Sequence, residues 1–232
     1  MRRFVPLLFF LSLPLTASAE WKELAPGLSY EARPESQAHV FRIDLKKNRV
    51  DVLTAPVLNR SALTAREFRE HTQAVLAVNG GFFDAAFQGM GLIVRDGKVL
   101  QPLRASAWGI FAVSKDEARI LHRKDWNPKG VTAALQVGPR LVVDGEVQHF
   151  KEAGPSRRSA VGITPEGEIE IAVAEKPMLL SEWAAFMGKD CPNVLNLDGG
   201  GSTQISVHAG DFDLNVEGYT AVPNALGIFS RR

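Results

Sequence analysis

Residues 194–203 read Val-Leu-Asn-Leu-Asp-Gly-Gly-Gly-Ser-Thr, a short apolar strand pattern with a polar, glycine-rich end. Asp198 stands where the strand pattern stops, and three glycines follow it directly. Glycine tolerates positive φ angles and lets a ligand approach the backbone amides closely. Consecutive exposed amides form a concave site that suits an anion. The stretch therefore predicts a rigidly held carboxylate, Asp198, beside an anion-binding turn that includes Gly199, Gly200 and Ser202.

A second stretch has the same order of features. Residues 75–84 read Val-Leu-Ala-Val-Asn-Gly-Gly-Phe-Phe-Asp, so that an apolar strand ends at Asn79 and is followed by Gly80 and Gly81. An ordinary tight turn would explain a single Gly-Gly pair. Three glycines after a strand-terminal Asp are harder to explain in that way, because glycine in an element interior costs roughly 0.5–1 kcal/mol relative to Ala. Neither stretch has the spacing of a phosphate loop or of a dinucleotide-binding turn, so nucleotide binding is not predicted.

Two charged residues on other predicted strands are candidates for the same site. Arg158 lies in residues 156–162, Ser-Arg-Arg-Ser-Ala-Val-Gly, at the start of a strand. Its planar fork of donors can clamp a phosphate, although a solvated surface arginine fits the spacing equally well. Glu175 follows the strand pattern of residues 168–174 and is a second candidate carboxylate. As an isolated residue, Glu175 also fits an ordinary surface position.

The rest of the chain is rich in strand patterns with explicit turn signals. Residues 39–45 alternate apolar and polar side chains with period two, and residues 49–53 are predicted to be their hairpin partner. Asp-Gly turns predict hairpins over residues 91–100 and 140–147, and a Glu-Gly turn predicts a longer one over 160–174.

Helices are expected over residues 63–71 and 179–187. Ser61 or Thr64 would cap the first helix and Ser181 the second. Further strands are expected over residues 74–78, 194–197, 204–208 and 225–229. Many hairpins with few helices predict an α+β fold of hairpin-rich, mixed or antiparallel sheets with a few packed helices, in a single domain over residues 20–232.

Composition narrows the function classes. The 232-residue chain is 45% hydrophobic and has a net charge of +1, so neither nucleic acid nor an anionic membrane surface is indicated as a partner. Cys191 is the single cysteine, so no intramolecular disulfide can form. The five histidines are scattered without metal-ligand spacing, and no metal ligands are assigned.

The N-terminus has the order of a secretory signal. Arg2 and Arg3 precede an apolar run over residues 4–15, and Ala17-Ser18-Ala19 forms a small-x-small cleavage site. The apolar run is shorter than the roughly 20 residues that span a bilayer. Residues 1–19 are therefore predicted to be a signal peptide rather than a membrane anchor, and the mature protein is predicted to be periplasmic or secreted.

Six segments together resemble the phosphodiester glycosidase family, and the resemblance spans residues 40–229. Asn196-Leu197-Asp198-Gly199-Gly200-Gly201-Ser202 carries its most specific signature, and Val222 to Leu226 resembles its closing Val-x-Asn-Ala-Leu. Many members have Arg-Pro before that closing Val, where this chain has Thr220-Ala221, and the segment after Glu175 lacks the expected glycine-rich stretch. The remaining four segments are Asn79-Gly80-Gly81-Phe82-Phe83, Gly91 to Gly97, Gly138-Pro139 to Gly145, and Arg158-Ser159-Ala160-Val161-Gly162.

The resemblance implies hydrolysis of a sugar-1-phosphodiester to free sugar and a phosphomonoester. Asp198 would act at the anomeric carbon, as nucleophile or as base for water. The other implied catalytic residues are Arg158, Asn79 and Glu175, and the implied substrate-binding residues are Gly80, Gly81, Gly199, Gly200, Ser202 and Asn196. The expected partner is a sugar-phosphate or glycan.

No cofactor is expected, and a divalent cation next to Asp198 stays an open alternative. Two rival functions also stay open. One is a non-catalytic module that binds envelope polysaccharide or glycolipid. The other is a transglycosylase that modifies exopolysaccharide and uses a sugar hydroxyl as acceptor.

The signal pattern makes one direct prediction. The mature protein should begin at Glu20, because the small-x-small site ends at Ala19. N-terminal sequencing of protein recovered from the envelope or the medium measures this. Recovery of a soluble cytoplasmic protein that still begins with Met1 would contradict it.

Overall fold

The computed structural model describes residues 20–231, so the predicted signal peptide lies outside the described residues. The described chain forms 18 strands in three sheets, and every strand pair in it is antiparallel. The predicted antiparallel, hairpin-rich sheets with few helices are therefore confirmed, but the fold is dominated by sheet, with two α-helices, more strongly than the predicted α+β class implies.

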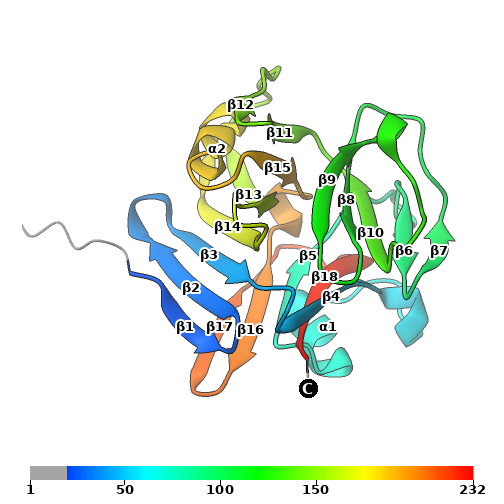
Figure 1. Cartoon of the computed structure of the whole chain (residues 1–232), viewed down its shortest axis with the longest axis horizontal. Coiled ribbons are helices and arrows are strands. Elements are labelled where there is room, and N and C mark those ends of the chain that lie inside the picture. The colour runs from blue at the N-terminus through cyan, green and yellow to red at the C-terminus, as the bar shows by residue number, and fades with distance from the viewer. Residues whose placement is uncertain (1–19, 232) are drawn as a thin grey trace, which may run out of the picture.

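Sheet I has eight strands in the order β1-β2-β3-β14-β13-β15-β11-β12. Figure 1 shows it with α2 packed against it. Its strands are β1 (Lys22–Ala25), β2 (Leu28–Arg33), β3 (Ala38–Ile43), β14 (Ile169–Met178), β13 (Ser156–Ile163), β15 (Asn193–Asn196), β11 (Arg140–Val143) and β12 (Glu146–Val147).

Sheets II and III have five strands each. Sheet II runs β17-β16-β5-β18-β4 and sheet III runs β7-β6-β10-β8-β9. The strands of sheet II are β17 (Phe212–Val216), β16 (Ile205–Ala209), β5 (Leu76–Asn79), β18 (Asn224–Ser230) and β4 (Asn48–Thr54). Those of sheet III are β7 (Lys98–Gln101), β6 (Ile93–Arg95), β10 (Ala133–Val137), β8 (Gly109–Val113) and β9 (Ala118–His122).

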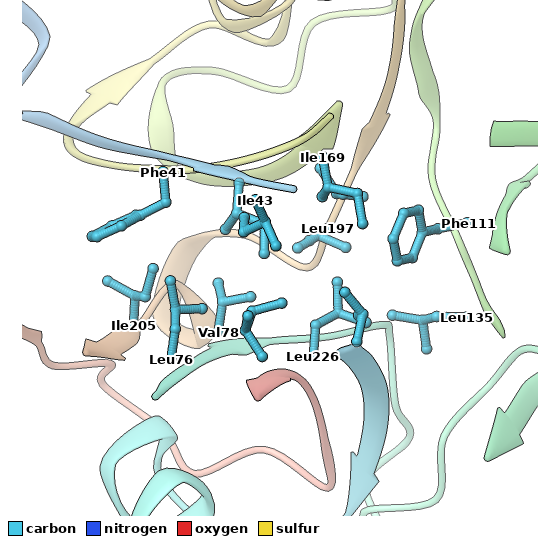
Figure 2. Packing of buried hydrophobic residues seen from close by; sticks show 14 of the residues in the cluster. Phe41, Ile43, Leu76, Val78, Phe111, Leu135, Ile169, Leu197, Ile205 and Leu226 are labelled. Atoms are coloured by element: carbon cyan, nitrogen blue, oxygen red, sulfur yellow. The ribbon is translucent and has the colours of Figure 1, made fainter. Parts of the chain in front are cut away.

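One buried apolar cluster joins the three sheets. Phe41 of sheet I, Leu76 of sheet II and Phe111 of sheet III all belong to it and are almost fully buried. Figure 2 shows these side chains converging from opposite layers. Side chains alternate between the two faces of a strand, so Val161 of β13 enters this core, whereas its neighbour Ala160 packs in a second cluster with Trp183 of α2. Sheet I is thus buried on both faces.

Both predicted helices are present. The predicted N-cap of the first helix is confirmed at Thr64, whereas the predicted N-cap of the second helix, Ser181, is wrong. In α1 (Ala65–Thr72), the Thr64 hydroxyl accepts a hydrogen bond from the Glu67 amide, so Thr64 rather than Ser61 is the cap. In α2 (Leu180–Met187), Ser181 lies inside the first turn and does not cap it. The carboxylate of Glu152 instead accepts hydrogen bonds from the amides of Leu180 and Ser181, because an ordered segment far away in sequence reaches the helix end.

The Asp-Gly hairpins are confirmed. Asp96 and Gly97 both have positive φ (48° and 72°), as do Asp144 and Gly145 (49° and 86°), which is the backbone of a two-residue hairpin turn. The β13–β14 hairpin is also confirmed.

The predicted pairing of residues 39–45 with 49–53 is wrong. Both strands exist, but β3 pairs with β2 and β14 in sheet I, whereas β4 pairs with β18 in sheet II. The chain turns at residues 44–48 and crosses from one sheet to the other, so that Ile43 and Val50 meet in the core between the sheets. The burial of both strands against that shared core decides their separation.

No helix within residues 20–231 has the length and apolar character needed to cross a membrane.

Candidate functional site

The side chain of Asn79 joins three segments that are far apart in sequence. It is fully buried at the end of β5. Its Nδ2 donates to the backbone oxygen of Asp198 at 2.6 Å, and its Oδ1 accepts from the Ser159 hydroxyl at 2.8 Å and from the Gln204 amide at 3.1 Å. Asn79 and Asp198 are therefore brought into direct contact. Because Asn79 is buried and its hydrogen bonds go to the protein, the side chain positions the site rather than touching a substrate.

Gly80 and Gly81 also serve the framework. The Gly80 amide donates to the backbone oxygen of Asn224 at 3.0 Å, and the Gly81 amide donates to the Asn224 Oδ1 at 2.6 Å. Both amides are occupied, so the predicted anion-binding role of these two glycines is not supported. A Cβ on Gly80 would lie 2.2 Å from the Asn224 Oδ1, which explains the need for glycine there. The Gly80 carbonyl in turn accepts from the Asp198 amide at 3.0 Å.

Asp198 itself is partly exposed and lies two residues after the end of β15. The Ser202 side chain and the Gly199 backbone amide are polar neighbours of its carboxylate. Burial raises the pKa of Asp198 above its ordinary value, and these two polar neighbours oppose the rise without cancelling it. The site thus contains a carboxylate that is held in a fixed position and partly desolvated, which is a common property of catalytic acids and bases.

The glycine turn after Asp198 offers free amides at Gly200 and Gly201. Within the described residues, no hydrogen bond engages either N–H group. Gly200 has a positive φ of 63°, which favours glycine. The turn is anchored from outside, because the Gly201 carbonyl accepts from the amides of Tyr219 and Thr220. The predicted anion-binding turn over residues 199–201 therefore retains two unpaired amide donors, those of Gly200 and Gly201, beside Asp198.

Arg158 lies next to Asp198 in the register of sheet I. Ala160 pairs with Asn196, and the Leu197 amide donates to the Ser159 carbonyl, so one more step of the same register places Arg158 opposite Asp198. Its Nε donates to the Met178 carbonyl at 2.9 Å and its Nη2 to the Gly154 carbonyl at 3.3 Å. No ion pair joins Arg158 to Asp198 within residues 20–231.

Glu175 belongs to a different polar group, on the face of sheet I opposite Arg158. Its Oε1 lies 3.5 Å from the His39 Nε2, and its Oε2 lies 3.9 Å from the Arg157 Nη2. The Tyr30 hydroxyl is 2.9 Å from the His39 Nδ1. The described contacts of Glu175 are therefore with His39 and Arg157.

The last two sequence-predicted residues, Asn196 and Ser202, are buried next to the glycine turn. Asn196 is 5% exposed, and its Nδ2 donates to the carbonyls of Leu197 and Gly138. Ser202 is also 5% exposed, and its side chain opposes the rise in the pKa of Asp198. The Asn196 Nδ2 is therefore occupied by backbone carbonyls, whereas its Oδ1 has no partner in the described chain.

Two further residues that hold the site were given no role from the sequence. Asn224 fixes Gly80 and Gly81, and the Gln204 Nε2 ties Ser202 to Thr220 by donating to both carbonyls. Asn224 lies in the closing motif of residues 222–226, which singled out this residue but did not predict its hydrogen bonds to Gly80 and Gly81. Residues 20–231 contain no group of three His, Cys, Asp or Glu side chains arranged to hold a metal ion.

Comparison with known proteins identifies relatives of this fold. The sequence model of the phosphodiester glycosidase family matches residues 72–229. No curated protein sequence is significantly similar to the chain. The catalytic domain of zebrafish N-acetylglucosamine-1-phosphodiester alpha-N-acetylglucosaminidase, auto-inhibited by its pro-peptide, superposes with a TM-score of 0.68 at 19% identity, covering 88% of this chain and 82% of that one.

Two bacterial structures have the same fold. A protein from Synechocystis superposes with a TM-score of 0.65 at 15% identity, covering 93% of this chain and 64% of that one. A Burkholderia pseudomallei protein assigned to export superposes with a TM-score of 0.61 at 12% identity, covering 87% of this chain and 74% of that one. At these identities the likeness establishes the fold.

The contacts of Asn79 predict a large loss of stability on substitution. Asn79→Ala leaves the Ser159 hydroxyl, the Gln204 amide and the Asp198 carbonyl without their buried partner, which should lower the free energy of unfolding by about 3 kcal/mol or more. Urea denaturation measures this loss. The control is Asn127→Ala at an exposed loop, where only a solvent-exposed hydrogen bond from the Lys129 amide is lost, so stability should fall by no more than about 1 kcal/mol. A loss no larger than that of the control would contradict the role assigned to Asn79.

The raised pKa of Asp198 predicts a pH-dependent stability difference. The folded state binds a proton on Asp198 more tightly than the unfolded chain, so ionisation of this group removes stability as the pH rises from the ordinary value of 3.8 through the raised one. Asp198→Asn should therefore be more stable than the parent at pH 7, and the difference should shrink towards pH 3.5. Thermal melts of both proteins at pH 7 and pH 3.5 measure the difference in stability between variant and parent. A variant whose advantage over the parent is smaller at pH 7 than at pH 3.5 would contradict the prediction.

Proposed function

Because the chain belongs to the phosphodiester glycosidase family, we propose that it hydrolyses a sugar-1-phosphodiester to free sugar and a phosphomonoester. The observation that carries the proposal is the arrangement around Asp198. A partly desolvated carboxylate, with Ser202 and Gly199 as polar neighbours, lies beside the unpaired amides of Gly200 and Gly201. A carboxylate suits the anomeric carbon, and free amides suit the phosphate.

The chemistry needs charge stabilisation more than a strong acid. A phosphomonoester leaves an anomeric carbon far more readily than an alcohol does, so the developing negative charge on the phosphate is the main target for the protein. The amides of Gly200 and Gly201 donate to that charge from fixed positions. The bond between the anomeric carbon and its oxygen breaks, and that oxygen leaves with the phosphate. Asp198 either attacks the carbon directly or takes the proton of the attacking water.

Arg158 is proposed as the cation at the phosphate. It lies opposite Asp198 in the sheet register, and its Nη1 has no hydrogen bond to the described chain. Burial lowers the pKa of Arg158, but a guanidinium stays protonated at neutral pH. The two carbonyls that hold its Nε and Nη2 fix the plane of the group, so the remaining donors are presented in one orientation.

The proposed place of action is outside the cytoplasm, on envelope or extracellular glycans. The signal pattern of residues 1–19 supports export. The Burkholderia pseudomallei protein of similar fold is itself assigned to export. An exported hydrolase without a nucleotide-binding motif suits a glycan substrate rather than an intracellular metabolite.

A non-catalytic glycan-binding module is the second candidate. The observation that favours it is Thr220-Ala221, where many family members have Arg-Pro before the closing Val. The Thr220 amide and carbonyl are used by Gly201 and Gln204, so this position supports the turn without adding a charge to the site. Binding without turnover is the result that this alternative predicts.

The bond that breaks tests the proposal. The methyl phosphodiesters of α-glucose 1-phosphate and α-N-acetylglucosamine 1-phosphate are incubated with the protein in oxygen-18 water, and both products are analysed by mass. Attack at carbon should place the label in the sugar. Label in the phosphate alone would assign phosphodiesterase chemistry, and saccharide binding without product from a broad diester panel would favour the binding module.

The role of Asp198 has a matched test. Asp198→Asn should lower turnover by about a thousandfold or more, because the nearly isosteric amide preserves packing but cannot supply the charge. Asp213→Asn, at a carboxylate that is 70% exposed, is the control and should keep parental activity. Parental turnover in Asp198→Asn removes this residue from the mechanism.

A further inference from the structure

Tyr219 is an exposed aromatic side chain at the edge of the Asp198 turn. It is 84% exposed, more than any other large hydrophobic side chain in residues 20–231. Its backbone is nevertheless fixed, because the Tyr219 amide donates to the Gly201 carbonyl at 2.7 Å. A Cβ on Gly201 would lie 3.7 Å from the Cβ of Tyr219. The Tyr219 side chain therefore begins directly beside the glycine turn. An aromatic ring left in water at this point has no packing role.

Arg157 fixes the segment that carries this ring. Its Nη1 donates to the Glu217 carbonyl at 2.9 Å, and its guanidinium carbon lies 5.1 Å from the centre of the Tyr219 ring. Arg157 is only 8% exposed and its Nε has no hydrogen-bond partner in the described chain. A buried cation against one side of an exposed ring holds the ring in place. The exposure of Tyr219 leaves the other side of the ring open to solvent.

We infer that the open face of Tyr219 binds a neutral pyranose ring of the substrate, and that Arg157 is its positioning residue. The apolar C–H face of a pyranose packs on an aromatic face, while its hydroxyls stay in water. The ring stands beside Gly201, three residues after Asp198, so a sugar on it lies next to the carboxylate and the free amides. The inference rests on the proposed function, and it assigns sugar recognition to a residue outside the phosphate-binding turn.

The two adjacent arginines then have separate tasks. Side chains alternate along β13, so Arg157 faces Tyr219 and Glu175, whereas Arg158 faces the Met178 carbonyl on the other side of the sheet. Arg158 is proposed to act on the phosphate, and Arg157 acts on the sugar through Tyr219. Changes at the two positions should therefore affect different parts of the ligand.

Saccharide binding tests this without needing turnover. Methyl α-glucoside and methyl α-N-acetylglucosaminide are titrated by NMR into the Asp198→Asn variant, with dimethyl phosphate as the phosphate probe. Adding Tyr219→Ala should weaken binding of the glycosides about tenfold and leave dimethyl phosphate unaffected. Adding Tyr219→Phe instead should leave glycoside binding as it is in Asp198→Asn alone, because the ring and not the hydroxyl makes the contact. Val99→Ala, at a 57% exposed side chain in sheet III, is the control for loss of exposed apolar surface.

Arg157 is tested through its dependence on Tyr219. Arg157→Lys should weaken glycoside binding in the parent but have little further effect in the Tyr219→Ala background, since its action passes through the ring. Equal glycoside affinity in Tyr219→Ala and Tyr219→Phe overturns the inference even if hydrolysis proceeds as proposed. Tyr219-dependent glycoside binding with no hydrolysis of any diester retains the inference and rejects the proposed reaction.

Discussion

The buried side-chain amide of Asn79 is the interaction on which the site depends. An unpaired amide in a core is costly. This one is satisfied only when sheet I supplies the Ser159 hydroxyl, the turn supplies the Asp198 carbonyl and the residue before β16 supplies the Gln204 amide. The three partners lie 80, 119 and 125 residues from Asn79 in the sequence. The geometry of Asp198 is thus a consequence of how sheets I and II pack.

The neighbouring polar side chains follow the same rule. Asn224 occupies the amides of Gly80 and Gly81, and Gln204 joins the Ser202 and Thr220 carbonyls. These buried amide side chains bind backbone groups that the crossing between sheets would otherwise leave unpaired. Within residues 20–231, the backbone amides of Gly200 and Gly201, next to the carboxylate, have no hydrogen-bond partner.

Local patterns in the sequence predicted elements better than their partners. The Asp96-Gly97 and Asp144-Gly145 turns were predictable, because a two-residue hairpin needs positive φ at both positions. The separation of β3 and β4 into different sheets was not, because the period-two pattern shows that a strand has a buried face without showing which strand lies beside it. The cap of α2 was missed for a related reason, since Glu152 reaches Leu180 and Ser181 from 28 and 29 residues away.

The candidate site shows the same division. The sequence marked Asp198 and its glycines correctly as neighbours of Asn79, because strand-terminal polar residues before glycines are unusual. It could not show that Asn79 and Asn196 are buried, since an amide side chain that binds a ligand and one that binds backbone look alike in one sequence. It also could not separate Arg157 from Arg158, because their opposite directions follow from strand alternation and from the contacts each finally makes.

The turn after Asp198 is proposed to hold a sugar-1-phosphodiester with its anomeric carbon at the carboxylate. A crystal structure of the Asp198→Asn variant with the methyl phosphodiester of α-N-acetylglucosamine 1-phosphate measures this directly. The phosphate should lie on the amides of Gly200 and Gly201, with the anomeric carbon facing the side chain at position 198. A ligand that turns its phosphorus atom towards position 198, or that binds away from this turn, would rule out attack by Asp198 at carbon.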